Sequence, residues 1–455
     1  MRCDRVILTV LCGVWLCFQT AYAGSTDLRP LIASAQSGDT LLIPPGIYEG
    51  NLTIDKRLTV LGVDNPVIHG NGRGSVITIT ADSCTVKGLV IEHSGAMLVN
   101  EDAGVLIKSH FNLVEQNELR DVLFGIYLFH AEHNMVLNNR IIGRPKLELG
   151  ERGSGIHIWN SEHNMFRGNS ITDVRDGFYI QNASHSLIEH NEVFNVRYGV
   201  HYMYADSNRF LYNRFYDNVA GAAIMYSRGI TMRHNVFNHN RGFSSFGILF
   251  QDCHGLTADS NVISDNVVGM FFEATTGNAF RHNVIAQNDI ALQMFQNSIN
   301  NTFSENNFID NLNPLVVVGK TTSSQWSEGG RGNYWSQYDG YDLDGDGIGD
   351  VPMKIMNVFN YLEGRNANTR LYLYSPAAQA LAVAAKAFPI LDLGAERDEQ
   401  PLINPASLAA IPAVTTASIA MTAQPKPHMM WGAFPLLAVV ILGIVYRHFS
   451  RRGTL

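Results

Sequence analysis

Residues 155–220 repeat one pattern three times, in blocks of 22 residues that read GIHIWNSEHNMFRGNSITDVRD at 155–176, GFYIQNASHSLIEHNEVFNVRY at 177–198 and GVHYMYADSNRFLYNRFYDNVA at 199–220. Each block begins with Gly. The same position continues at Gly221, Gly247, Gly269 and Ala291, after steps of 22, 26, 22 and 22 residues. Before Gly155 it is found at Gly125 and Gly104, with steps of 30 and 21. A fixed period in this range is typical of a solenoid.

Inside each block, the residues that follow Gly alternate between two kinds of position. The first and third are apolar, as in the pairs Ile156/Ile158 and Val200/Tyr202. This period of two predicts a short strand with one buried face. An Asn follows 14 residues after the Gly, at Asn139, Asn169, Asn191, Asn213, Asn235, Asn261 and Asn283. Asn tolerates left-handed turns and can stack its amide on the next coil. The pattern predicts a parallel β-helix of about 22 residues per coil, since the Leu-rich consensus of leucine-rich repeats is absent.

The solenoid is expected to fill residues 24–375. Residues 28–35 read as a short capping helix and 38–48 as the first coil. The longer steps predict loops at 143–154 and 241–246, and such loops are natural partner-contact sites of a solenoid. The repeats resemble the pectate-lyase-like superfamily, and this resemblance implies that the all-β helix is right-handed.

Composition limits the classes of partner. The chain has 455 residues, 46% of them hydrophobic, and a net charge of -8. Such a chain is not disordered, and it lacks the basic face that nucleic acid requires. Residues 1–23 read as a secretory signal peptide, in which Arg2 and Arg5 precede an apolar run and Ala21-Tyr22-Ala23 forms the cleavage site. Cys84 and Cys253 alone would remain afterwards, too few for a disulfide scaffold.

The opposite end is expected to meet the membrane. Residues 429–446 are apolar and uncharged, long enough for a transmembrane helix, and a basic tail at 447–455 would stay cytoplasmic. Between the solenoid and this helix, residues 376–428 read as an extension and linker, rich in Ala, Pro and Thr from about Gln400 onward. A buried core helix and a removable sorting tail are the alternatives for 429–446.

The second and fourth residues after each Gly are expected to point away from the core. There the sequence places aromatic residues, His and Met where Thr, Ser, Lys and Glu would be ordinary. A contiguous apolar surface usually marks an interaction site. The predicted stripe consists of Tyr127, Phe129, His157, Trp159 and Tyr179.

A candidate metal site follows on the same face. His201 and Met203 share one strand face about 7 Å apart, and Met225 is expected one coil further, about 4.8 Å from Met203. Thioether and imidazole ligands without a carboxylate favour Cu(I) over zinc or hard cations. The alternative is that both methionines are adaptable packing under a loop.

A second candidate metal site lies in an acidic loop at residues 339–350. Asp342, Asp344, Asp346 and Asp350, with Gly347 at the turn position, match the first part of a calcium loop. Met353 stands where the bidentate Glu of a complete EF-hand would be. Structural Ca²⁺ is therefore predicted, with a plain acidic turn as the alternative.

Three motifs together resemble the NosD family of periplasmic proteins that support nitrous oxide reductase maturation. They are GVHYMY at 199–204, AIMYS at 223–227 and GNYWSQY at 332–338, which leads into the acidic loop; the pair SPA at 375–377 and FPI at 388–390 adds to them. The resemblance covers roughly residues 25–405. It implies a non-enzymatic periplasmic protein that binds Cu(I) through His201, Met203 and Met225. It also implies docking on the ATPase and permease of an ABC transporter, copper supply by a lipoprotein chaperone, and copper–sulfide centre assembly in nitrous oxide reductase. A C-terminal membrane helix would be a departure from this family.

The alternative is a β-helix protein that binds or cleaves polysaccharide, because fold alone does not determine function. Glycoside cleavage usually needs two carboxylates across the scissile bond. Among the second and fourth positions, Glu273 is the one carboxylate, and an Asp with an Arg or Lys base is not expected on this face. The expected class is therefore a non-enzyme.

Overall fold

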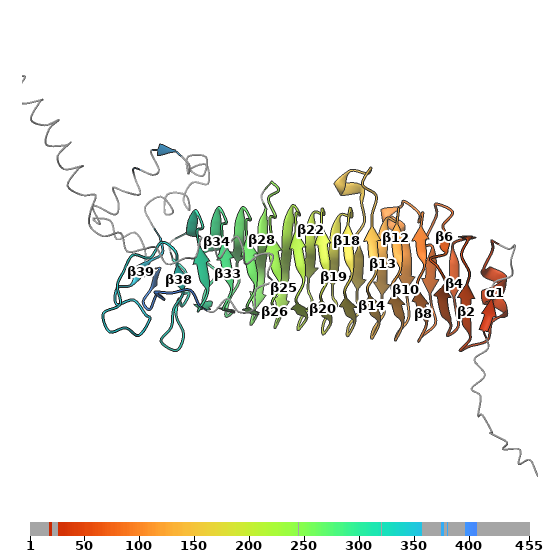
Figure 1. The fold of residues 1–455 in the computed structure, drawn as a ribbon, viewed down its shortest axis with the longest axis horizontal. Helices are drawn as coiled ribbons and strands as arrows, with labels where there is room; N and C mark the ends of the chain where they lie inside the picture. The colour runs from red at the N-terminus through yellow and green to blue at the C-terminus, as the bar shows by residue number, and fades with distance from the viewer. Residues whose placement is uncertain are drawn as a thin grey trace, which may run out of the picture.

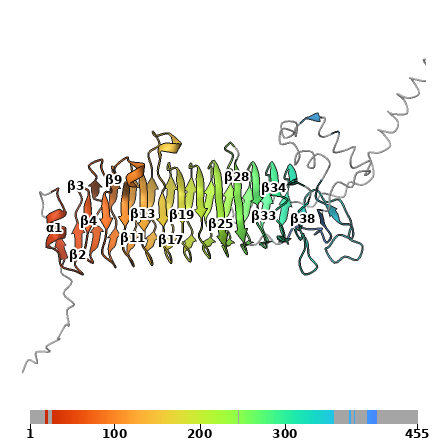
Figure 2. The same cartoon turned by 180° about the vertical axis from the view of Figure 1, so that it is seen from behind.

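The computed structural model describes residues 18–20, 26–243, 245–319, 321–356, 375–376, 380 and 396–406. Over this part the chain winds into one elongated right-handed parallel β-helix of about 13 coils, which confirms the predicted fold class (Figure 1). Each coil contributes one strand to each of three parallel sheets. The three sheets run the full length of the solenoid, as Figure 2 shows from behind.

The sheets are called first, second and third, and from the first sheet each coil passes to the third and then to the second. The first sheet contains β1 (Phe18–Thr20), β2 (Thr40–Ile43), β5 (Thr59–Gly62), β8 (Thr85–Lys87), β11 (Leu113–Glu115), β14 (Met135–Leu137), β17 (Met165–Arg167), β20 (Leu187–Glu189), β23 (Arg209–Leu211), β26 (Thr231–Arg233), β29 (Thr257–Asp259), β32 (Ala279–Arg281) and β35 (Thr302–Ser304). The second sheet contains β4 (Leu52–Ile54), β7 (Ile77–Ile79), β10 (Ala103–Ile107), β13 (Phe124–Phe129), β16 (Ile156–Trp159), β19 (Asp176–Gln181), β22 (Tyr198–Met203), β25 (Ala220–Arg228), β28 (Phe246–His254), β31 (Val268–Glu273), β34 (Ile290–Phe295) and β37 (Asn313–Val318). The third sheet contains β3 (Ile47–Glu49), β6 (Val67–His69), β9 (Val90–Glu92), β12 (Glu118–Arg120), β15 (Arg140–Ile142), β18 (Ser170–Thr172), β21 (Glu192–Phe194), β24 (Arg214–Tyr216), β27 (Val236–Asn238), β30 (Val262–Ser264), β33 (Val284–Ala286), β36 (Asn307–Ile309) and β38 (Tyr334–Trp335).

The predicted alternation in the Gly strands is confirmed. Ile156, Ile158, Val200 and Tyr202 are at most 1% exposed and point into the solenoid. Parallel pairing sets β19, β22 and β25 in register, so residues 22 positions apart stack directly on one another. At the Gly itself a side chain does not fit: a Cβ at Gly199 would lie 2.4 Å from the carbonyl oxygen of Gly221. The Gly column therefore follows from close packing of neighbouring coils.

The predicted Asn ladder is also confirmed. The side-chain amide of Asn191 donates to Oδ1 of Asn213 at 3.0 Å, and Asn213 donates to Asn235 at 2.9 Å. Each Asn also donates to a backbone carbonyl, as Asn213 does to Ile188. Buried polar groups at the turns are thus paired from coil to coil, which stabilises the stack. A further ladder, which the sequence analysis did not identify, joins Asn240, Asn266, Asn288 and Asn311.

Both ends of the solenoid are covered. At the N-terminal end, α1 (Arg29–Ser34) lies over the first coil and buries Ile32, which confirms the predicted capping helix. At the C-terminal end, β40 (Arg397–Asp398) pairs with β39 (Met353–Lys354), and Leu402 is buried next to Tyr334. Covering the ends protects apolar core and unpaired strand edges from solvent. Residues 400–406 therefore pack on the solenoid and are not part of a free linker.

The predicted terminal segments fall largely outside the described residues. Within the predicted signal peptide, β1 pairs with β2, so cleavage after Ala23 would leave β2 as the edge of the first sheet. The predicted transmembrane helix at 429–446 and the tail at 447–455 lie outside the described residues. Within the described residues, no helix has the length and apolar character needed to cross a membrane.

A short 3-10 helix, Leu98–Asn100, precedes β10. The loop expected at 143–154 projects from the solenoid between β15 and β16 and contains another, Leu149–Glu151. Arg144 anchors this loop. Its guanidinium donates to the carbonyl oxygens of Ser94 at 2.6 Å and Gly95 at 3.1 Å, and it pairs with Asp121 at 3.0 Å. The loop is thereby held at the turns that connect the third sheet to the second.

Candidate functional site

The three predicted copper ligands lie on the outer face of the second sheet. Met203, at the end of β22, pairs in register with Met225 of β25, and His201 lies two residues before Met203 on the same strand. Adjacent parallel strands are about 4.8 Å apart, so the two thioethers are neighbours. Met203 and Met225 are partly exposed, and the His201 side chain is 16% exposed. The structure therefore places the two methionines in register on neighbouring strands and His201 two residues earlier, all at positions that are partly exposed.

Asp176, a residue outside the predicted site, orients His201. The Asp176 carboxylate is fully buried, and its Oδ2 lies 3.3 Å from Nδ1 of His201. Arg197 donates to both oxygens of the same carboxylate, at 2.8 and 2.7 Å. Burial alone would raise the pKa of Asp176, but the hydrogen bonds from His201 and Arg197 hold it below its ordinary value. Asp176 is therefore ionised at physiological pH.

This arrangement leaves one imidazole nitrogen for a ligand. Nδ1 of His201 faces Asp176 at 3.3 Å and the Arg197 guanidinium at 3.5 Å, and Nε2 has no hydrogen-bond partner among the described residues. A carboxylate or carbonyl on the second nitrogen is the common device that fixes the tautomer and orientation of a metal-binding His. Together with the two thioethers, such an imidazole would form a soft donor set, of the kind that suits Cu(I).

Aromatic rings flank His201. The Tyr179 ring meets the imidazole edge-to-face at 5.0 Å, and the Tyr198 ring does so at 5.4 Å. The Arg197 guanidinium lies over Tyr198 at 4.5 Å. Burial raises the pKa of Tyr179, so its hydroxyl stays protonated and donates to Gln181 at 2.7 Å. These contacts limit the rotation of His201 and partly exclude water from its face.

The predicted surface stripe is wrong for two of its five residues. Tyr127 is 2% and His157 is 6% exposed. Leu147 of the loop at 143–154 packs onto the cluster that contains Tyr127 and Phe124, and the His157 ring lies against both of these rings. Phe129 and Trp159 are partly buried against the same cluster, and Tyr179 is half-buried. The apolar outer face is therefore, in this part, a second core under the loop and not an open surface.

His157 is buried without hydrogen-bond partners. Both of its ring nitrogens are enclosed and unpaired within the described structure. The ring stacks on Tyr179 at 4.4 Å and meets Tyr127 edge-to-face at 4.6 Å. Burial, with the nearby Arg175 cation, lowers the pKa of His157 to about 3. The side chain is therefore neutral at any pH near neutrality.

Asp176 escaped the sequence analysis because of the column to which it belongs. The residue before each Gly packs in the same outer layer as the second and fourth positions, as Phe124 does next to Tyr127 and Val268 near Phe271. Strict alternation counted from the Gly assigns this column to the other face. The expectation that no Asp with Arg lies on this face is corrected by Asp176 and Arg197.

The acidic loop brings together three of its four predicted ligands. Carboxylate oxygens of Asp342, Asp344 and Asp346 lie within 4.8 Å of one another, whereas Asp350 accepts a hydrogen bond from the Leu343 N–H at 2.7 Å. Hydrogen bonds from the Gly347 and Gly345 N–H groups lower the pKa of Asp342. The Asp346 N–H acts in the same direction on Asp344, but the Asp346 charge leaves the pKa of Asp344 raised. Such crowding is compatible with Ca²⁺, which remains a prediction.

The motif at 332–338 has a structural role at the C-terminal end. Asn333 accepts from Asn306 at 2.9 Å and so ends the Asn ladder, and Trp335 donates its indole N–H to Asp398 at 2.9 Å. Burial raises the pKa of Asp398. Of the segments 375–377 and 388–390, the structure describes residues 375 and 376.

Comparison with known proteins gives one family and close relatives. The family model described as "Periplasmic copper-binding protein (NosD)" matches residues 138–340. A "Probable ABC transporter binding protein NosD" of Pseudomonas aeruginosa is 37% identical over 398 residues, covering 85% of this chain and 92% of that protein. A protein of the same description from Stutzerimonas stutzeri is 34% identical, covering 80% and 86%. Among solved structures, the A-module of the Azotobacter vinelandii mannuronan C-5 epimerase AlgE6 has 15% identity and a TM-score of 0.48, covering 66% of this chain and 92% of that one.

Proposed function

Because the chain belongs to the NosD family of periplasmic copper-binding proteins, we propose that it carries Cu(I) as cargo on the second sheet, at His201, Met203 and Met225. The observation that carries this proposal is the register pairing of Met203 with Met225, two residues after a His201 whose Nδ1 is held by Asp176. An oriented imidazole loses less freedom when it binds, which favours affinity.

The site is suited to transfer as well as binding. Met203 and Met225 are partly exposed, so a donor or acceptor protein can approach the ion directly. Thioethers hold Cu(I) without a charged ligand, and exchange with another soft site then requires no separation of charge. We propose that a lipoprotein copper chaperone loads the site and that the copper serves copper–sulfide centre assembly in nitrous oxide reductase.

The relatives are named as ABC transporter binding proteins. On this basis we propose that the chain docks on the ATPase and permease subunits of such a transporter. The predicted signal peptide would export it to the periplasm, and the predicted helix at 429–446 would tether it to the inner membrane. The proposed role is that of an accessory protein without catalytic activity of its own.

Polysaccharide binding or cleavage is the second candidate, because Asp176, Arg197 and Tyr179 lie together on the outer face. The Asp176 carboxylate has no exposed surface and accepts three hydrogen bonds from Arg197 and His201. A group so enclosed is not placed to meet a sugar. The arrangement therefore supports an orienting role for Asp176 over a catalytic one.

The test is a titration of the purified full-length protein with Cu(I) against a competing chelator. The variant His201→Ala/Met203→Ala/Met225→Ala is expected to lose Cu(I) affinity by about 100-fold or more, since it lacks the whole donor set. The matched control is His190→Ala/Met97→Ala/Met135→Ala, which removes the same residue types at exposed positions away from the site. Equal affinity of the site variant and the unaltered protein would contradict the proposal. Degradation of polyuronates by the purified protein would instead support the second candidate.

A further inference from the structure

A column of histidines lies in the turns that connect the second sheet to the first. His133, His163 and His185 occupy the same position in successive coils, with φ of 56°, 57° and 58°. Their rings stack at 5.2 and 5.1 Å. His is among the residues that adopt left-handed backbone more readily than most. The coil geometry therefore fixes the spacing of these imidazoles before any ligand binds.

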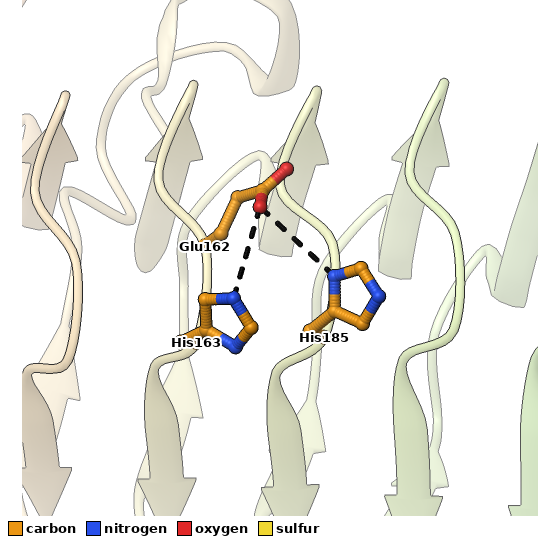
Figure 3. A group of neighbouring side chains, drawn as sticks. All are labelled: Glu162, His163 and His185. Carbon is orange, nitrogen blue, oxygen red and sulfur yellow. Dashed lines mark ion pairs between the residues drawn. The ribbon is translucent and has the colours of Figure 1, made fainter.

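Glu162 adds a carboxylate to this column. Its Oε2 lies 3.9 Å from Nε2 of His163 and 3.9 Å from Nδ1 of His185 (Figure 3). One donor atom from each of the three residues lies within 4.8 Å of the others. The side chains are 43–52% exposed, so an ion from solvent can reach them.

These separations are too long for direct hydrogen bonds, which need about 3.2 Å or less between N and O. They are close to what a shared ion requires. Ligand atoms about 2.0–2.1 Å from a tetrahedral centre lie about 3.4 Å from one another. Rotation of the exposed side chains would close this difference and tilt the stacked ring planes toward the ion, while the paired strands on either side keep the backbone in place.

We propose that Glu162, His163 and His185 form a second metal site, which binds a divalent transition-metal ion of the Zn²⁺ type with water as the fourth ligand. Two imidazoles and one carboxylate are a usual ligand set for such ions. Ca²⁺ and Mg²⁺ prefer all-oxygen ligands, and Cu(I) prefers thioether or thiolate. The site therefore differs in ion preference from His201, Met203 and Met225, and it does not depend on the function proposed for them.

The experiment measures Zn²⁺ binding by the full-length protein in competition with a chromophoric chelator. The variant His163→Asn/His185→Asn keeps residues that tolerate left-handed backbone, and it is expected to bind Zn²⁺ about 100-fold more weakly at this site. Glu162→Gln is expected to weaken binding about 10-fold, since it removes the charge and keeps the shape. Zn²⁺ should also raise the melting temperature of the unaltered protein and not that of the double variant.

The matched control is His190→Asn/His234→Asn, which changes two histidines of a neighbouring column with φ of 54° at both positions. The Tyr212 ring separates them, at 5.0 Å from His190 and 4.7 Å from His234, so they do not share an ion. Zn²⁺ affinity is expected to persist in this control. Equal Zn²⁺ affinity of the unaltered protein and His163→Asn/His185→Asn would overturn the proposal. Cu(I) affinity, measured in parallel, is expected to be the same in both, so failure of this site and failure of the copper site are distinguishable.

Discussion

His157 and His201 lie on the same face of the second sheet, one on each side of Tyr179, and their surroundings are opposite. His157 is buried against Tyr127 and Phe124, onto which Leu147 of the loop at 143–154 packs, and both of its nitrogens are unpaired. His201 is partly exposed, and Asp176 holds its Nδ1. Equivalent positions of a regular solenoid thus hold a packing residue and the residue that we propose as a metal ligand. The differences come from one insertion and one buried carboxylate.

The largest effect is expected from removing the carboxylate. Asp176→Ala leaves the Arg197 guanidinium partly buried without its partner and releases His201. Breaking a fully buried pair lowers the free energy of unfolding by about 3–5 kcal/mol. The loss expected here is smaller than that range, because the Arg197 side chain is 34% exposed and solvent screens its charge. Loss of the orienting group should also weaken Cu(I) binding about 10- to 100-fold. Urea denaturation and chelator competition measure the two effects.

Asp176→Asn is the control for that prediction, because it keeps the shape and one acceptor oxygen. It is expected to fall between the unaltered protein and Asp176→Ala in both measurements. If Asp176→Ala were as stable as the unaltered protein, the carboxylate would not hold the two side chains as described.

The second prediction concerns His157 and pH. The folded pKa of about 3 is below the value of the unfolded chain, so between these pH values the unfolded state binds a proton that the folded state does not. Stability from this residue is therefore full above about pH 6.5 and falls by about 1.4 kcal/mol per pH unit below it. His157→Phe keeps the ring stack and removes this dependence. Urea denaturation at pH 7.5 and pH 5.0 should show a difference of about 2 kcal/mol between variant and unaltered protein at the lower pH.

His190→Phe serves as the matched control, because His190 is exposed and stacks on Tyr212 in the same way. Its pH profile should follow that of the unaltered protein. A His157→Phe profile that does the same would show that His157 takes up a proton in the folded state and is not enclosed.

The third prediction tests whether the loop at 143–154 shields the cluster around Tyr127 from solvent. Leu147 is the residue of the loop that packs on the cluster around Tyr127, so Leu147→Ser should reduce stability by about 1–2 kcal/mol. It should also admit solvent to His157, and acylation of that imidazole by diethylpyrocarbonate, followed by mass spectrometry, reports the change. His201 is expected to react alike in both proteins. A His157 that stays unreactive in Leu147→Ser would mean that other residues cover it.

Regular features of this molecule could be predicted from the sequence, and irregular ones could not. The Gly and Asn columns recur at fixed spacing because every coil has to satisfy the same close approach and the same buried amides. The second ladder, from Asn240 to Asn311, has similar spacing and is predictable from the sequence for the same reason. The burial of Tyr127 depends on where the inserted loop at 143–154 packs, and the local sequence pattern does not predict that position. Asp176 was missed because the outer layer includes the residue before each Gly.

The smallest effect on stability is expected at the two methionines, and it separates packing from binding. Leu has nearly the volume of Met, and such exchanges usually cost less than about 1.5 kcal/mol even in a core. Met203 and Met225 are partly exposed, so Met203→Leu/Met225→Leu should cost about 0.5 kcal/mol or less in urea denaturation. The same variant lacks both thioethers and should lose most of its Cu(I) affinity. Met270→Leu/Met294→Leu, at buried positions of β31 and β34, is the control that leaves Cu(I) affinity unchanged. If the exposed pair instead lowered stability while Cu(I) binding persisted, the methionines would be packing residues like those around His157, and the contrast between the two regions would be one of exposure alone.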